Sequence, residues 1–323
     1  MSFRRISNTI LALTLTAGVA AASAQTRPAP DAAPKPVATA AAKASESLKF
    51  AVIGDSGTGS SSQRRVADRL VAARASFPYE FVLMLGDNMY GSHNPKDYAK
   101  KFEEPYKALL DAKVPFYAAL GNHDDPSERY YKPFNMNGER YYTFKPQDDV
   151  RFFALDSNYM DKAQLDWFEK QLQASGSEWK VVFFHHPIYS SGGAHGSDLE
   201  LRAQLEPMFL KYGVDAVFAG HEHFYERIKP QKGIYYFISG GAAKLREGDV
   251  NTRSELTAKS FDAGYHFMLV EITPDALKFQ TITDQGKTID SGTLPRNSDE
   301  VKKQFAGPIP GSRTPVGTSG TTK

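Results

Sequence analysis

Hydrophobic and polar residues follow two kinds of pattern in the middle of the chain. Apolar residues recur at helical spacing over 62–75 and 161–174, and Asp161 is suited to cap the second of these helices. Short apolar runs, each bounded by Gly, Asp or His, predict buried strands. These runs are 48–53, 81–85, 114–120, 150–155, 180–184 and 214–219. Alternating helices and buried strands predict an α/β domain.

The pattern changes toward the C-terminus. Pro207 predicts a fresh helix that ends before Gly213, because proline suits the first turn of a helix and glycine the position just past its end. Consecutive antiparallel strands are predicted after it, at 235–239, 265–273 and 276–283. The segment 240–264 between two of these strands is long enough to indicate either a lid over a functional site or a disordered excursion.

The first residues have the pattern of a secretory signal peptide. Arg4 and Arg5 are basic, 10–22 is uncharged and apolar but too short to span a bilayer, and 22–24 reads Ala-Ser-Ala, as at a cleavage site. An uncleaved membrane anchor is the weaker alternative, because no second apolar span follows. We therefore expect 1–24 to be a signal peptide that directs secretion to the periplasm or the extracellular space, and the mature protein to have no membrane span.

Two other segments are poor in bulky apolar side chains. Residues 25–47 are rich in Ala and Pro, and residues 295–323 in Pro, Gly, Ser and Thr. Neither can bury enough apolar surface to offset the entropy lost when a chain is ordered. We predict a disordered linker at 25–47, a disordered tail at 295–323 and a single domain at 48–294.

Composition narrows the chemistry. The 39 Lys and Arg residues nearly balance the 37 Asp and Glu residues, so the formal net charge of +2 gives no reason to expect a nucleic-acid partner or an anionic membrane. The chain has no cysteine, which excludes disulfides, thiolate metal sites and a cysteine nucleophile. Any metal must be held by His, Asp, Asn or Tyr. Composition does not indicate the oligomeric state.

Polar residues follow five of the predicted strands directly. They lie in the segments Gly54–Gly57, Gly86–Tyr90, Gly121–Asp124, Phe184–Pro187 and Gly220–His223. Ligands of open α/β sheets bind at the carboxyl ends of strands, so these groups are expected to converge on one crevice. Each group alone is typical of a turn or a helix cap, but clustered carboxylates and imidazoles are costly without a countercharge. A bound cation is the simplest explanation.

The candidate donors are too many for one tetrahedral zinc ion and suit two cations that share a carboxylate. They are Asp55, Asp87 and Tyr90 with oxygen atoms, Asn122 with an amide, and His185, His221 and His223 with imidazoles. In Gly-His-x-His, side chains of an extended segment alternate, so both rings can face a metal pair while Glu222 points away.

These ordered motifs resemble those of the calcineurin-like metallophosphoesterases. The motifs are Gly-Asp-x-Gly, Gly-Asp-x-x-Tyr, Gly-Asn-His-Asp, Val-x-x-His and Gly-His-x-His, within 50–273. Tyr90 makes the purple acid phosphatases the closest match, and the chain looks like their small, single-domain type. The resemblance implies a four-layer αββα sandwich of two mixed β-sheets flanked by helices, with 48–294 as the catalytic domain.

The resemblance also implies a ligand set. A ferric ion would be bound by Asp55, Asp87, Tyr90 and His223, and a divalent Fe, Zn or Mn ion by Asp87, Asn122, His185 and His221. Asp87 would bridge the two. Phenolate and carboxylate ligands suit Fe(III), whereas imidazole and amide ligands suit a divalent ion.

The implied activity is that of a secreted acid phosphatase. Phosphomonoesters, as small-molecule substrates, would be hydrolysed at acid pH by direct attack of a metal-bound hydroxide. His123 and His195 match the family's two substrate-contacting histidines, which would stabilise the phosphoryl charge or protonate the leaving group. Lys244 and Arg246, in the segment 240–264, are weaker candidates for substrate contact.

Two other functions stay open. A phosphodiesterase or nucleotidase would use the same metal pair, because the ligands are shared and only the shape of the pocket differs. A non-catalytic periplasmic protein that binds metal or phosphate is disfavoured, since such a site has no use for His123 and His195.

Several polar residues near the motifs are interpreted as structural. His186 is expected to turn away from His185, His93 lies past its motif, and His266 falls in a late strand. Asp124 and Glu222 are expected to form hydrogen bonds near the site.

Overall fold

The structure is a computed structural model, and it describes residues 47–305. The predicted signal peptide and all but the last residue of the predicted linker lie outside the described residues. No helix within 47–305 is both long enough and apolar enough to cross a membrane.

One of the two sheets contains the first three predicted strands. Its order is β13-β12-β11-β1-β2-β3. β1, β2 and β3 run parallel, and β11, β12 and β13 add to the β1 side as an antiparallel meander. The bounds are β1 (Leu48–Ile53), β2 (Phe81–Met84), β3 (Phe116–Ala118), β11 (His266–Ile272), β12 (Ala276–Thr283) and β13 (Thr288–Pro295).

The other sheet has the order β10-β8-β9-β7-β6-β5-β4. Its parallel strands are β5, β6, β7 and β9, whereas β4, β8 and β10 are antiparallel to their neighbours. The bounds are β4 (Tyr142–Gln147), β5 (Val150–Ala154), β6 (Trp179–Phe184), β7 (Ala216–Ala219), β8 (Tyr225–Ile228), β9 (Tyr235–Ser239) and β10 (Thr257–Phe261).

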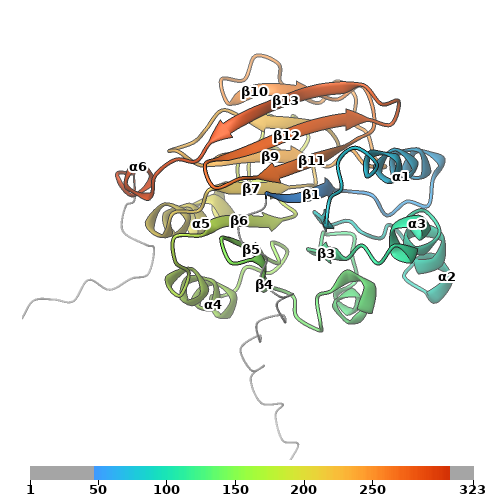
Figure 1. The fold of residues 1–323 in the computed structure, drawn as a ribbon, viewed down its shortest axis with the longest axis horizontal. Helices are drawn as coiled ribbons and strands as arrows, with labels where there is room; N and C mark the ends of the chain where they lie inside the picture. The colour runs from blue at the N-terminus through green and yellow to red at the C-terminus, as the bar shows by residue number, and fades with distance from the viewer. Residues whose placement is uncertain (1–46, 306–323) are drawn as a thin grey trace, which may run out of the picture. The chain divides into compact units, whose positions relative to one another are not determined.

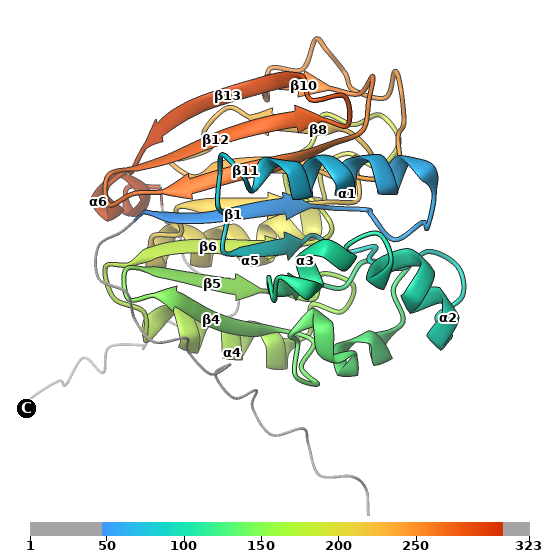
Figure 2. The ribbon, with the colours of Figure 1, turned by 45° about the vertical axis from the view of Figure 1, so that its right-hand side comes forward.

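Helices cover the outer faces of both sheets (Figure 1). Figure 2 shows α1 in front of β1 and β11, with α4 and α5 behind β4–β6. The α-helices are α1 (Ser61–Ala73), α2 (Pro95–Tyr98), α3 (Lys107–Asp111), α4 (Lys162–Gln173), α5 (Leu199–Tyr212) and α6 (Asp299–Lys303). A π-helical turn (Ala99–Glu103) and two 3-10 turns (Pro126–Tyr130, Lys132–Phe134) complete the secondary structure within 47–305.

Aromatic side chains fill the space between the two sheets. Phe50 of β1 packs edge-on against Phe152 of β5 and Phe218 of β7, with ring centroids 5.2 and 6.0 Å apart. Phe81 of β2 packs in the same way on Phe152 at 5.4 Å. A second apolar cluster joins the outer face of the β4–β10 sheet to α4 and α5 through residues such as Phe168. The predicted fold of two mixed sheets flanked by helices is confirmed.

One helix prediction is wrong. The helix expected to begin at Pro207 begins at Leu199, because the Asp198 carboxylate caps it by accepting a hydrogen bond from Leu201 N. Pro207 lies inside α5, and Ala203, whose carbonyl loses the usual helical bond to residue 207, is exposed to solvent. The predicted end is confirmed, since Gly213 takes the left-handed conformation with φ of 73°.

The prediction of a disordered tail from residue 295 is wrong for the described part of that tail, 295–305. Pro295 ends β13, and α6 follows it. The α6 residue Lys302 is fully buried, and its ammonium group pairs with Asp215 and donates to the Gly213 carbonyl. A buried ion pair therefore orders a segment that has few apolar residues.

Candidate metal centre

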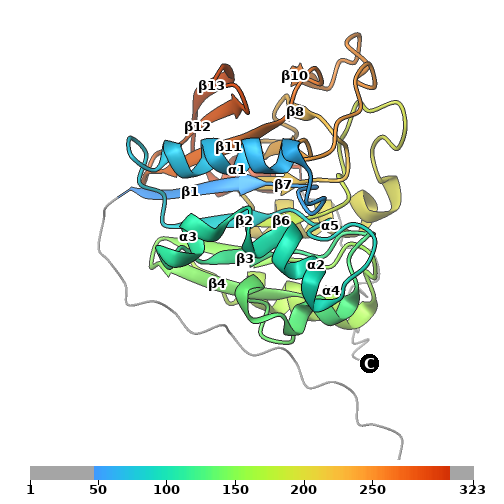
Figure 3. The same ribbon diagram turned by 90° about the vertical axis from the view of Figure 1, so that its right-hand side faces the viewer.

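The strand ends bring the predicted donors together from both sheets. Asp55, Asp87 and Asn122 follow β1, β2 and β3, while His185 follows β6, and His221 and His223 follow β7. Because the strands within each set are parallel, their carboxyl ends lie at one edge of each sheet. Figure 3 shows β1–β3 beside β6 and β7.

One half of the centre is rich in oxygen donors. The Tyr90 hydroxyl donates to Asp55 Oδ1 at 3.1 Å and lies 3.3 Å from His223 Nε2. His223 Nε2 is 3.4 Å from Asp55 Oδ1. Asp55, Asp87 and His223 each offer one ligand atom within 4.8 Å of the others, which is close enough to surround a single ion.

The other half is rich in nitrogen donors. His185 Nε2 lies 3.0 Å from Asn122 Oδ1 and 3.1 Å from His221 Nδ1. The same His185 nitrogen is 3.4 Å from Asp87 Oδ1. Asp87 therefore contacts both halves, as the predicted bridging role requires.

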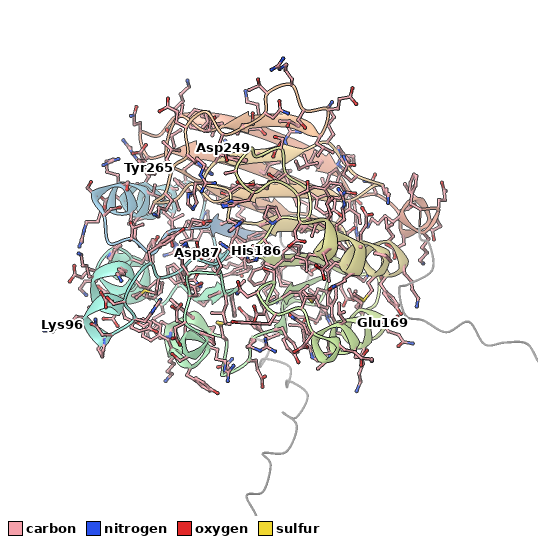
Figure 4. All side chains as sticks on the ribbon, turned by 180° about the vertical axis from the view of Figure 1, so that it is seen from behind. Asp87, Lys96, Glu169, His186, Asp249 and Tyr265 are labelled. Carbon is pink, nitrogen blue, oxygen red and sulfur yellow. The ribbon has the colours of Figure 1, made fainter. Side chains whose placement is uncertain are left out.

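The centre is buried at its base and open at its mouth. Asp55 and His185 are fully buried and Asp87 is 1% exposed, whereas Asn122, His123 and His195 are exposed. Figure 4 shows Asp87 and His186 near the middle of this face. A small anion from solvent can therefore reach the donors.

The backbone bends sharply where the donors leave their strands. Asp55, Asp87 and His221 have positive φ values of 57°, 50° and 69°, which disfavour residues other than glycine by about 1 kcal/mol each. The turn after β2 also requires Gly86, because its φ is 90° and a Cβ there would lie 2.6 Å from His185 Nδ1. The chain accepts local strain in order to place these side chains.

Burial and mutual repulsion act on the carboxylates. Burial and the charge of Asp87 raise the pKa of Asp55 well above its usual value. Burial alone would raise the pKa of Asp87, but His185 and the hydrogen bond from His123 N together lower it. A cation bound between the two buried carboxylates would offset their mutual repulsion.

The imidazoles are held neutral. Burial lowers the pKa of His185 to about 4. For His223, burial and the nearby Arg246 and Lys244 also lower it to about 4. Burial and neighbouring histidines lower the pKa of His221 to about 2. Neutral imidazoles keep a lone pair free for a metal ion.

Tyr90 shows the opposite behaviour. Burial and the negative charges of Asp55 and Asp87 raise the pKa of its hydroxyl far above the usual value. The phenol stays protonated unless a cation offsets those charges. The donor set therefore fits two cations, with an acidic oxygen-rich half and a neutral nitrogen-rich half.

The two predicted substrate histidines flank the mouth on different sides. The His123 ring lies 4.7 Å from the Tyr90 ring, and the His195 ring lies 4.1 Å from the His221 ring. His195 Nδ1 is 3.5 Å from Glu222 Oε2 and 3.3 Å from Arg246 Nη1. The first contact needs a proton on Nδ1 and the second a lone pair, so the tautomer of His195 depends on which partner it takes.

Asp124 and Glu222 form the hydrogen bonds expected near the centre. Asp124 accepts from Gly121 N, Met89 N and the Asn88 amide. Glu222 is fully buried and accepts from Gly196 N and Ser190 Oγ. Both carboxylates therefore support the loops that carry donors.

His186 does not turn away from the centre as predicted. Its ring centroid lies 4.9 Å from that of His185 and 4.5 Å from that of His221, and the three histidines form a group that could hold a metal. The prediction assumed the alternation of a strand, but β6 ends at Phe184. Ser157 Oγ lies 2.9 Å from His186 Nδ1 and holds the ring in place.

Lys244 and Arg246 reach the centre from the long segment after β9. Lys244 Nζ stands 4.6 Å from the centre of the Tyr90 ring, and Arg246 contacts His195. The segment is structured in part, since 257–261 form β10. Sequence alone gives only the length of this segment, and the structure shows that it passes Tyr90 of the oxygen-rich half and His195 beside the nitrogen-rich half.

The fold and the paired donor groups define an α/β protein with a centre for two metal ions. The model of the calcineurin-like phosphoesterase family matches residues 48–225, and the chain belongs to this family.

Similar proteins include two named phosphatases. The mouse (Mus musculus) protein "Tartrate-resistant acid phosphatase type 5" is 25% identical over 81% of this chain and 94% of its own length. "Purple acid phosphatase 17" of Arabidopsis thaliana is 28% identical over 72% of this chain and 80% of its own length.

The solved structure of a purple acid phosphatase from yellow lupin (Lupinus luteus) seeds has the same fold. It superposes with a TM-score of 0.65 at 18% identity, over 83% of this chain and 56% of the lupin chain. The predicted resemblance to purple acid phosphatases is confirmed at the level of family, fold and named relatives.

Proposed function

We propose that this protein hydrolyses phosphate monoesters at acid pH with two metal ions, Fe(III) in the oxygen-rich half and divalent Fe, Zn or Mn in the nitrogen-rich half. The observation that carries the proposal is the position of Asp87. Its carboxylate lies between the Asp55, Tyr90 and His223 group and the Asn122, His185 and His221 group. The named acid phosphatases among the relatives support the same reaction.

The two ions, when bound, would hold phosphate oxygens and activate water as the nucleophile. The side chains of the protein determine the environment in which that reaction takes place. The imidazole of His185 and the carboxylate of Asp87 are buried, and the Leu85 carbonyl and the His123 amide hold them in place. The half-buried His221 ring lies against His185, so the site needs little rearrangement. Water adds to phosphorus, the ester P–O bond breaks, and the alcohol departs with a proton.

The exposed histidines are suited to act on the substrate. His123 and His195 stand at the mouth, beside Tyr90 and His221 respectively, where each can face a phosphoryl oxygen or the leaving oxygen. A histidine that donates the proton to the leaving group contributes about 10² to 10⁴ in rate and works best where imidazolium persists. An acid optimum follows from that role.

Secretion is the expected setting of this activity. The proposal rests on Arg4, Arg5 and the apolar run 10–22. Expression of the full chain in a bacterium, followed by intact-mass measurement of the exported protein, would show cleavage after residue 24. A cytoplasmic product that retains residues 1–24 would contradict it.

The test of the reaction combines metal content with turnover. The purified protein, loaded with Fe and Zn, is expected to hold about two metal ions per chain, to absorb visible light through a tyrosinate-to-iron transition, and to hydrolyse p-nitrophenyl phosphate best below pH 7. Asp166→Asn, on the exposed face of α4, is the control substitution and should behave as the wild type.

Three results would change the assignment. Two metals with turnover of bis-p-nitrophenyl phosphate but little of the monoester would indicate a phosphodiesterase. Two colourless metals would contradict the Fe(III) and Tyr90 assignment only. A protein that binds no metal would contradict both reactions.

A further inference from the structure

A cavity of about 390 Å³ opens beside the nitrogen-rich half of the centre. Asn122 and His186 form the wall nearest the metals, and Ser157, Asn158 and Asp198 lie farther out. A second cavity of about 210 Å³ shares Ser157, Asn158 and Asp198 with the first and extends to Gln204. Together they form a groove that starts at the centre and follows the 155–160 loop to the beginning of α5.

The groove carries hydrogen-bond acceptors that lack donors. The Asn158 amide nitrogen donates to Leu120 O and Gly121 O, so its Oδ1 is fixed as an acceptor, and this oxygen is buried without a partner among residues 47–305. Gln204 Oε1, in the second cavity, is likewise buried and has no donor in the described part of the chain. Both oxygens have almost no accessible surface, so a ligand in the groove would reach them after a rotation of the Asn158 and Gln204 side chains. Buried acceptors without donors are costly, and a ligand that donates to them would remove that cost.

The charge of the groove is negative. Asp198 uses Oδ1 to cap α5, and no hydrogen bond within 47–305 engages its Oδ2. Asp156 is paired with Arg140, and Asp124 is fully engaged by backbone and amide donors.

Cations are absent from the walls of this groove. None of the residues that line the two cavities is Lys or Arg. Arg140 adjoins the wall, where its charge is shared between Asp156 and Asp161.

Lys244, which lines neither cavity, stands over the Tyr90 ring in the oxygen-rich half of the centre. An ester bound across the centre thus meets a cationic side chain at one end and acceptors at the other. This polarity would orient it, with phosphate oxygens toward Lys244 and the alcohol toward Asp198.

We propose that the groove binds the leaving group of the substrate and selects alcohols that carry hydroxyl or ammonium donors and no negative charge. The inference rests on the proposed phosphatase function. It assigns Asn158, Asp198 and Gln204 as specificity-determining residues. The preferred substrates are phosphate esters of polyols or amino alcohols, and esters with a carboxylate or a second phosphate on the alcohol are rejected.

The test compares two substrates that differ in one group. Glycerol 3-phosphate and 3-phosphoglycerate share the same reacting end, and a hydroxymethyl group in the first replaces a carboxylate in the second. The metal-loaded enzyme is expected to favour glycerol 3-phosphate by about tenfold or more in kcat/KM, because a carboxylate would face Asp198 and the unpaired amide oxygens. Phosphoethanolamine, which carries an ammonium group, should be accepted as well as glycerol 3-phosphate or better.

Asp198→Asn tests the charge without removing the helix cap, since asparagine caps helices as well as aspartate. It should lower the preference for glycerol 3-phosphate over 3-phosphoglycerate by about tenfold. Among the substrates tested, phosphoethanolamine should show the largest fall in kcat/KM. Gln204→Met, which removes the acceptor in the second cavity and leaves the cap intact, should lower kcat/KM for glucose 6-phosphate about threefold relative to glycerol 3-phosphate. Asp166→Asn, outside both cavities, is the matched control and should keep the wild-type ratios.

The outcomes separate the two proposals. An enzyme that hydrolyses p-nitrophenyl phosphate but treats the two glycerol derivatives alike would overturn the leaving-group assignment alone. An unchanged ratio in Asp198→Asn would do the same. A metal-loaded protein that hydrolyses no monoester would overturn the proposed function and this inference together.

Discussion

The two halves of the metal centre differ in whether protons must be displaced before an ion can bind. In the oxygen-rich half, Tyr90 is protonated and the pKa of Asp55 is raised by burial and by Asp87, so a cation has to displace protons. In the nitrogen-rich half, burial has already made His185 and His221 neutral. This difference favours the ions that we propose, one of high charge in the first half and a divalent one in the second, with Asp87 as the shared ligand.

The largest effect is expected where the two halves meet. Asp87→Asn keeps the size of the side chain but removes the charge that both ions would share, so kcat/KM for p-nitrophenyl phosphate should fall by roughly a thousandfold or more. Metal analysis should show loss of at least one ion per chain. Asp166→Asn is the matched control. Near-normal activity with two bound metals would mean that Asp87 does not bridge them.

A histidine outside both halves tests whether the loss of folding stability at acid pH comes from the metal centre. His266 is fully buried, and burial lowers its pKa from 6.5 to about 4. Between these values the unfolded chain binds a proton that the folded protein does not, so folding stability falls as pH drops from 6.5 to 4. The loss is about 3 kcal/mol for this group.

Urea unfolding of the metal-free protein at pH 7, 5.5 and 4 measures that loss. His266→Gln should flatten the pH dependence by about 3 kcal/mol. If loss of His266 leaves the slope unchanged, the acid sensitivity comes from other groups, with the buried imidazole of His185 as the first to examine.

The sequence predicted the centre better than the margins of the fold. Parallel strands such as β6 contain apolar runs that are followed by polar candidate ligands, so the pattern indicates both the strand and the candidate donor. Edge strands cannot be recognised from the sequence pattern in the same way. β10 is largely exposed and reads Thr-Ala-Lys-Ser-Phe, and β13 contains Asp290, Ser291 and Gly292, so neither has an apolar run to find.

Two misses have the same physical origin. Local preference favours a helix start at Pro207, but the Asp198 cap and the burial of Phe209 and Leu205 fix a longer helix. Strand alternation predicts that His186 turns away, but β6 stops at Phe184, before that residue. In both cases the tertiary structure overrides a local rule. Tertiary contacts cannot be predicted from the local pattern of a single sequence.

The smallest expected effect is a difference of one proton released on metal binding, and it distinguishes the two halves most directly. Loading the oxygen-rich half should release the Tyr90 proton, because a bound cation offsets the charges of Asp55 and Asp87 that keep the phenol protonated. Addition of Fe(III) to weakly buffered protein near pH 6, followed with a pH indicator, should therefore release about one proton fewer per chain in Tyr90→Phe than in the wild type. His185→Gln, in the other half, should not change that number, since its imidazole is already neutral at this pH. Equal proton release in wild type and Tyr90→Phe would place Tyr90 outside the ligand set, and a drop in His185→Gln as large as in Tyr90→Phe would show that the two halves do not differ as their geometry indicates.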